Sequence, residues 1–107
     1  MQSDSVVPKK VTAIFDYIKE EFDLPKQDVI KWEGDDGVEV EGTIFYPNNY
    51  RMGKKYPLVV QSHGGARSSD LWGGLFSTTS YAPVLTSNGY IILRPNYRGS
   101  LGYGDDF

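Results

Sequence analysis

The stretch Leu58-Val-Val-Gln-Ser-His-Gly-Gly65 decides the fold that the sequence predicts. It starts as a short apolar run and ends in a glycine-rich corner, and Tyr90-Ile-Ile-Leu-Arg94 is a second apolar run of similar length. Nearly continuous apolar runs are typical of parallel strands that are buried on both faces of an α/β sheet. We therefore expect two parallel strands here.

The segment between these runs predicts a helix. Tyr81-Ala-Pro-Val-Leu-Thr-Ser-Asn-Gly89 has the character of the last turns of a helix, because Gly89 suits the left-handed position after a helix end. Pro83 must then lie in the first turn or at a kink. A strand, a helix and a strand of this length form a right-handed crossover.

An Asp-Gly pair upstream predicts a β-hairpin. Asp28–Glu33 precedes Gly34-Asp-Asp-Gly37, and residues 38–46 alternate between two faces. Glycine supplies the positive φ that such a turn needs. We interpret Asp35 and Asp36 as turn residues and not as calcium ligands, because the EF-hand spacing is absent. The predicted fold is α/β: an antiparallel hairpin followed by a parallel strand-helix-strand unit.

The residues before the hairpin predict an amphipathic helix over 11–22, ended by Pro25. Its apolar stripe, with spacings of three and four, consists of Val11, Ile14, Phe15, Ile18 and Phe22. We expect this helix to pack on the body of the protein. Residues 1–27 are therefore interpreted as an N-terminal helix and linker, and residues 28–107 as one domain.

Composition and charge exclude several classes of protein. A hydrophobic fraction of 39% is far from that of a disordered chain, and a net charge of −3 without a basic run gives no footprint for nucleic acid or an anionic membrane. No segment has the length of a membrane span or signal peptide, although a longer protein could carry a signal before residue 1. The absence of cysteine excludes disulfides and is compatible with a reducing compartment, so we expect a cytoplasmic protein.

Chemistry is expected at the carboxyl ends of the two parallel strands, where open α/β sheets bind ligands. Residues 62–68 and 95–104 leave those ends and are rich in glycine and polar side chains. Gly64 and Gly65 let the backbone turn sharply with its N–H groups in a cleft, where they can hold a developing oxyanion. Taken alone, His63-Gly-Gly65 is also compatible with a tight turn of no catalytic value.

Several longer motifs occur in order between residues 28 and 106. They include Asp36-Gly-Val-Glu-Val-Glu-Gly42, Lys55-Tyr-Pro-Leu-Val-Val60, Arg94-Pro-Asn-Tyr-Arg-Gly-Ser100 and Gly102-Tyr-Gly104. With these motifs the chain resembles the prolyl oligopeptidase family of serine peptidases, and within it the branch of acylaminoacyl-peptidases and dipeptidyl-peptidase-like enzymes. The last two motifs are the most specific, whereas His-Gly-Gly is shared with many esterases.

The resemblance implies that residues 28–107 form the N-terminal half of an α/β-hydrolase peptidase domain, which in this family normally follows a β-propeller that restricts access to short peptides. Gly64 or Gly65 would then give a backbone N–H to the oxyanion hole. His63 is the position nearest to the tyrosine that supplies a hydroxyl in other branches, so we rely on the backbone donor. No metal or organic cofactor is implied.

The same resemblance suggests further residues of the substrate cleft: His63, Asn96, Tyr97 and Arg98. For His63 we favour a loop-shaping role, because the base of the family lies near the end of the domain. Arg98 either lines the cleft or, as we favour, pairs with a carboxylate that fixes the loop.

The Gly-x-Ser-x-Gly nucleophile elbow is absent from the 107 residues, so we expect the chain alone to be inactive. The main hypothesis is a fragment of a serine peptidase that acts on short peptides. The alternatives are a truncated, non-catalytic binding or assembly module and a fragment of an esterase of the same fold. One or two helices cannot cover the predicted strands, so the expected partners are the remainder of the hydrolase domain or a second copy, joined through uncovered strands.

Overall fold

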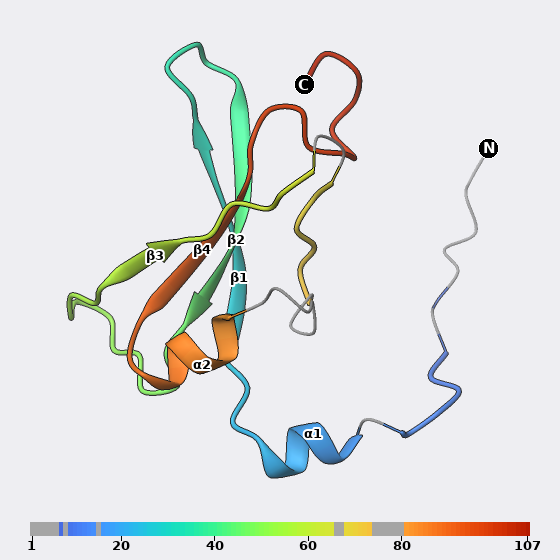
Figure 1. Ribbon diagram of the computed structural model, residues 1–107, viewed down its shortest axis with the longest axis vertical. Helices are drawn as coiled ribbons and strands as arrows, with labels where there is room; N and C mark the ends of the chain where they lie inside the picture. Colours follow the sequence, from blue (N-terminus) through green and yellow to red (C-terminus); the bar gives the residue numbers. More distant parts are fainter. Residues whose placement is uncertain (1–6, 8, 15, 66–67, 74–80) are drawn as a thin grey trace.

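The computed structural model describes residues 7, 9–14, 16–65, 68–73 and 81–107, and at its centre is a mixed four-stranded sheet (Figure 1). The strands follow the order β1-β2-β4-β3, with bounds Lys26–Glu33, Glu39–Tyr46, Ile91–Asn96 and Leu58–Val60. β2 pairs antiparallel with both β1 and β4, and β3 pairs parallel with β4. The predicted α/β class, with a hairpin followed by a parallel pair, is confirmed.

The turn between β1 and β2 has the predicted glycine chemistry. The amide of Gly34 donates to the carbonyl of Val38 at 2.9 Å, and the amide of Gly37 donates to the carbonyl of Gly34 at 2.9 Å. Gly37 has a φ of +77°, in the region that glycine adopts without a steric penalty. β1 begins at Lys26, so the strand extends two residues into the segment that was interpreted as a linker.

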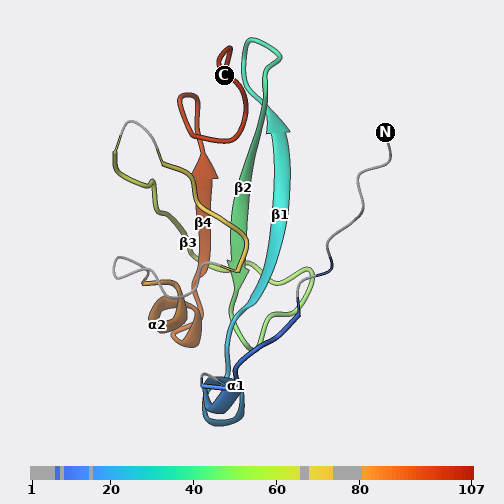
Figure 2. The ribbon, with the colours of Figure 1, turned by 90° about the vertical axis from the view of Figure 1, so that its right-hand side faces the viewer.

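Helix α2, Ala82–Ser87, connects the two parallel strands and packs against one face of the sheet (Figure 2). Pro83 lies in its first turn, and Gly89 follows it with a φ of +85°, both as predicted. Ala82 forms the core with Phe45 of β2 and Ile92 of β4, and all three are fully buried. Burial of a side chain the size of Phe45 or Ile92 contributes about 1.5–3 kcal/mol to stability.

Strand β3 is the exception to the expected burial. It lies at the edge of the sheet, and Leu58 and Val60 are 54% and 58% exposed. A parallel strand becomes buried on both faces only when further strands and helices surround it. Among the described residues α2 covers only part of one face of the sheet. The prediction that β3 is buried on both faces is therefore wrong, whereas the exposure of β3 agrees with the prediction that one or two helices leave strands uncovered.

The N-terminal helix differs from its prediction in length and packing. Helix α1 comprises only Asp16–Glu21 and lies beyond the end of the sheet in both views (Figures 1 and 2). Val11 and Ile14 precede it, and both are exposed together with Phe22, while Phe15 lies outside the described residues. A periodic pattern does not sustain a longer helix without a surface against which its apolar stripe can pack.

Neither helix within the described ranges is long and apolar enough to cross a membrane.

Candidate functional site

The two predicted loops meet at one end of the sheet, because β3 and β4 are parallel and their carboxyl ends lie side by side. His63 follows β3, Tyr97 follows β4, and their rings stack with centroids 4.5 Å apart and planes inclined by 19°. This ring contact joins the loop after β3 to the loop after β4, which is more than thirty residues further along the sequence. Both side chains were predicted to belong to the site. Ala66 and Arg67 of the first loop lie outside the described residues.

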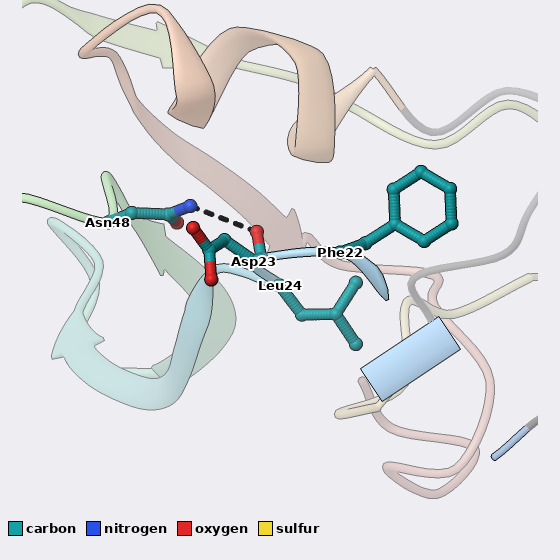
Figure 3. Close-up of a pocket in the computed structure, with 4 residues that line it drawn as sticks. All are labelled: Phe22, Asp23, Leu24 and Asn48. Atoms are coloured by element: carbon teal, nitrogen blue, oxygen red, sulfur yellow. Dashed lines mark hydrogen bonds between the residues drawn. The ribbon is translucent and has the colours of Figure 1, made fainter. Parts of the chain in front are cut away.

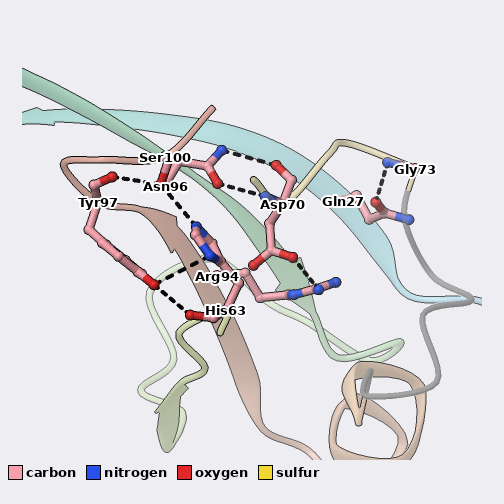
Figure 4. A network of polar contacts seen from close by, with 8 residues as sticks. All are labelled: Gln27, His63, Asp70, Gly73, Arg94, Asn96, Tyr97 and Ser100. Carbon is pink, nitrogen blue, oxygen red and sulfur yellow. Dashed lines mark hydrogen bonds and ion pairs between the residues drawn. The ribbon is translucent and has the colours of Figure 1, made fainter. Parts of the chain in front are cut away.

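His63, Tyr97 and Ser100 form a closed circuit of hydrogen bonds (Figure 4). The Tyr97 hydroxyl donates to the His63 carbonyl oxygen at 2.6 Å, and the Ser100 hydroxyl donates to the Tyr97 carbonyl oxygen at 2.6 Å. Nε2 of His63 lies 2.9 Å from Oγ of Ser100. Because the only proton of Ser100 is directed at Tyr97, we assign the Nε2 proton of His63 to this contact.

This circuit supports a loop-shaping role for His63. Its Nε2 is engaged as a donor to Ser100, which is itself buried. Nδ1 lies 3.3 Å from the Tyr97 hydroxyl, whose proton points to the His63 carbonyl. A general base needs a ring nitrogen that faces the reacting group, and both nitrogens of His63 face the loop instead. Ser100 is the last residue of the Arg94–Ser100 motif, and its sequence context gives no sign of its contact with His63.

Gly64 and Gly65 form an exposed corner directly after His63. Gly65 has a φ of +80°, and a Cβ atom built on either glycine would meet no atom within 4 Å. Within the described part of the chain, neither backbone amide donates to another backbone group. Among the described residues the corner therefore holds two N–H groups that have no backbone acceptor, and donors of this kind are what an oxyanion-binding loop requires.

Asn96 is buried and engaged in holding loops together. Its side-chain oxygen accepts from the Asp70 amide at 2.7 Å, and its Nδ2 donates to the Asp70 carbonyl oxygen at 3.0 Å and to the Tyr103 hydroxyl at 2.8 Å. The Tyr103 hydroxyl in turn donates to Oε1 of Glu41 at 2.6 Å. Asn96 was a candidate for substrate contact, but 3% exposure and these contacts favour a structural role.

A buried ion pair lies beneath the same loops. Asp70 and Arg94, both less than a tenth exposed, are joined through Oδ1 and Nη2 (Figure 4). Sequence reasoning missed this pair, although Arg94 at the end of an apolar run signals that an acidic partner is needed, because a charge is rarely buried alone. The partner, Asp70, is 24 residues away in sequence.

Arg98 pairs with a carboxylate. Its partner is Asp36 in the β1–β2 turn, and both side chains are about half exposed. This is the favoured one of the two roles considered for Arg98. The ion pair connects the hairpin turn to the loop after β4, but exposed pairs of this kind contribute only about 0–1 kcal/mol.

The environment of Tyr103 shifts its ionisation. Burial raises the pKa of Tyr103 above the ordinary value of 10.0, and the hydrogen bond to the Glu41 carboxylate raises that pKa further. The phenol therefore stays protonated at neutral pH and remains a donor to Glu41.

A separate depression lies at the opposite end of the sheet (Figure 3). It has a volume of about 540 Å³ and is lined by Phe22, Asp23, Leu24 and Asn48. The Asn48 side chain donates to the Asp23 carbonyl oxygen at 2.9 Å across it. No three His, Asp or Glu side chains among the described residues are grouped as a metal site.

Known proteins that are similar to this chain are peptidases, whether the similarity is in sequence or in structure. Dipeptidyl-peptidase 5 of Aspergillus oryzae is 37% identical over 67 residues, which are 63% of this chain and 9% of that protein. The probable dipeptidyl-peptidase 5 of Emericella nidulans is 31% identical over 75 residues, 70% of this chain and 10% of that protein. The chain therefore spans about a tenth of these relatives. No protein-family model matches it.

Two solved structures share the fold. An acylaminoacyl peptidase in complex with Z-Gly-Gly-Phe-chloromethyl ketone superposes with a TM-score of 0.65 at 24% identity, over 89% of this chain and 14% of that one. Dipeptidyl peptidase 4 of Porphyromonas gingivalis gives a TM-score of 0.63 at 15% identity, over 81% of this chain and 12% of that one. At these identities the likeness establishes the fold.

Proposed function

We propose that this chain, which is related in sequence and fold to the prolyl oligopeptidase family of serine peptidases, supplies the oxyanion-hole loop of a peptidase that acts on short peptides. The resemblance drawn from the sequence motifs is confirmed, because the curated relatives are dipeptidyl-peptidases 5 and the structural neighbours are peptidases of the same family. The role of the individual residues is our proposal.

The observation that carries the proposal is the open glycine corner after β3. In acyl transfer, the carbonyl oxygen of the substrate becomes negatively charged when a serine attacks the carbonyl carbon. The N–H of Gly64 or Gly65 would donate to that oxygen together with the N–H of the residue after the nucleophile. One such donor typically contributes a factor of about 10²–10³ to kcat.

The remaining catalytic groups are proposed to come from outside these residues. The 107-residue sequence has no Gly-x-Ser-x-Gly elbow, and His63, its only histidine, is engaged with Tyr97 and Ser100. The chain would contribute four strands of the sheet and the glycine corner, and the exposed edge of β3 would receive the remainder of the hydrolase domain. A longer protein is therefore the expected catalyst.

Substrate preference and location are also proposals. The relatives are dipeptidyl-peptidases by name and one neighbour is an acylaminoacyl peptidase, so we propose a short peptide with either a free or an acylated N-terminus. We propose the cytoplasm as the compartment, since the sequence contains no cysteine, and cell fractionation would test this.

Hydrolysis assays test the proposed function. A protein that carries these residues together with the rest of the hydrolase domain should release p-nitroaniline from a dipeptidyl or an N-acetyl-aminoacyl anilide, and residues 1–107 should not. Hydrolysis of p-nitrophenyl esters without either anilide would assign the protein to the esterases. Turnover by residues 1–107 alone would contradict the proposal.

A non-catalytic assembly module is the second candidate, and its physical motive is the exposed edge of β3. An edge strand with exposed apolar side chains pairs readily with another chain. If the longer protein hydrolyses none of these substrates while residues 1–107 form a stable complex with a second copy, this candidate replaces the first.

A further inference from the structure

Tyr97 makes a contact that acts on the main chain of the proposed oxyanion loop. Its hydroxyl donates to the carbonyl oxygen of His63 at 2.6 Å, and its ring stacks on the His63 ring (Figure 4). The hydroxyl is therefore held over the peptide bond that joins His63 to Gly64.

That peptide bond carries one of the two candidate donors. The carbonyl of His63 and the N–H of Gly64 belong to the same planar unit, and no peptide bond among the described residues is cis. In a trans peptide the C=O and the N–H point in opposite directions. A hydrogen bond that fixes the carbonyl on the Tyr97 side therefore fixes the Gly64 N–H on the opposite side of this peptide unit.

We infer that Tyr97 is a positioning residue of the oxyanion hole, which aims the N–H of Gly64. This inference rests on the proposed function. Two glycines in succession leave the backbone free to rotate, so a loop of this composition needs an external contact that selects one orientation. The Tyr97 hydroxyl supplies that contact from the neighbouring strand.

The same hydrogen bond strengthens the donor. An amide whose carbonyl accepts a hydrogen bond is polarised, so that its N–H becomes a better donor. The Tyr97 hydroxyl thus acts on both the direction and the strength of the Gly64 N–H without touching the substrate.

The rest of the circuit holds Tyr97 itself. Ser100, which is buried, donates to the Tyr97 carbonyl oxygen at 2.6 Å, and Nε2 of His63 contacts Ser100. Both the main chain and the ring of Tyr97 are therefore fixed by neighbours. The variant Tyr97→Phe retains the ring stack and removes only the hydroxyl, so it isolates the contact with the His63 carbonyl.

The test compares Tyr97→Phe with the wild type in the longer protein that contains the whole hydrolase domain, using the best anilide substrate. We expect kcat to fall about tenfold, the factor that corresponds to one typical hydrogen bond, with KM changed less than about twofold. A peptide aldehyde, which forms a tetrahedral adduct, should lose affinity by a similar factor. Tyr90→Phe, at an exposed tyrosine before β4, is the matched control and should change neither value.

Two results would contradict the positioning role of Tyr97, and they differ in what they mean for the proposed function. If the wild type is active and Tyr97→Phe retains its kcat and its aldehyde affinity, or raises only KM, the positioning role is wrong and the proposed function stands. If the wild-type protein neither turns over the anilides nor reacts with a fluorophosphonate, the proposed function is wrong and this inference fails with it.

Discussion

Asp70 and Arg94 form an ion pair that is almost completely buried under the two loops of the candidate site. Arg94 lies on the central strand β4, and Asp70 lies in the segment after the glycine corner, where its main chain is held by Asn96. One side-chain pair thus anchors that segment to the sheet.

Asp70→Ala should destabilise the protein strongly. Removal of one partner leaves the other charge buried and uncompensated, which typically costs about 3–5 kcal/mol of the free energy of unfolding. Urea denaturation measures this change. Glu39→Ala, which removes the exposed partner of Lys31, is the control and should lower the free energy of unfolding far less than Asp70→Ala does. Equal effects of the two substitutions would contradict the assigned burial.

The two glycines of the corner should respond differently to alanine. Gly65 has a φ of +80°, where a Cβ atom costs about 1–2 kcal/mol, whereas Gly64 has no positive φ. Neither added Cβ would meet an atom within 4 Å, so steric crowding does not enter the comparison. Thermal unfolding should therefore show a lower Tm for Gly65→Ala than for Gly64→Ala, and the reverse order would mean that the corner has another conformation.

Stability should fall at alkaline pH, partly through Tyr103. Burial and the bond to Glu41 raise the pKa of the folded phenol above 10.0, so the unfolded chain loses this proton first. The stabilising contribution is therefore complete below about pH 10 and is lost as the pH rises through the folded pKa. Urea denaturation at about pH 9 and about pH 11 should show a smaller drop for Tyr103→Phe than for the wild type. Burial also raises the pKa of Tyr46, so part of the drop should remain in the variant.

The exposed strand β3 should make residues 1–107 associate when they are produced alone. Leu58 and Val60 are more than half exposed on an edge strand that has an unpaired side among the described residues. Val60→Lys places a charge on this edge and should shift the sedimentation profile towards the monomer. A wild-type chain that stays monomeric on concentration would contradict the prediction.

The elements that the sequence predicted correctly depend on local signals. The turn at Asp36-Gly37, Pro83 in the first turn of α2 and Gly89 after it are each set by the conformational limits of one or two residues. Such limits act in the same way whatever the rest of the chain does.

The features that the sequence did not reveal depend on distant partners. His63 and Ser100 are 37 residues apart, and nothing near either residue indicates the other. The length of α1 and the exposure of β3 follow from which surfaces are present to pack against them, and periodicity contains no information on that. The glycine corner could be predicted from its motif, whereas the circuit that holds it could not.

Labelling with a fluorophosphonate, which reacts with activated serines, tests the central claim most directly. The longer protein that includes these residues and the rest of the hydrolase domain should be labelled, and residues 1–107 should remain unlabelled because their serines lack a triad. Labelling of the 107-residue chain itself, or an unreactive longer protein that is folded, would contradict this account.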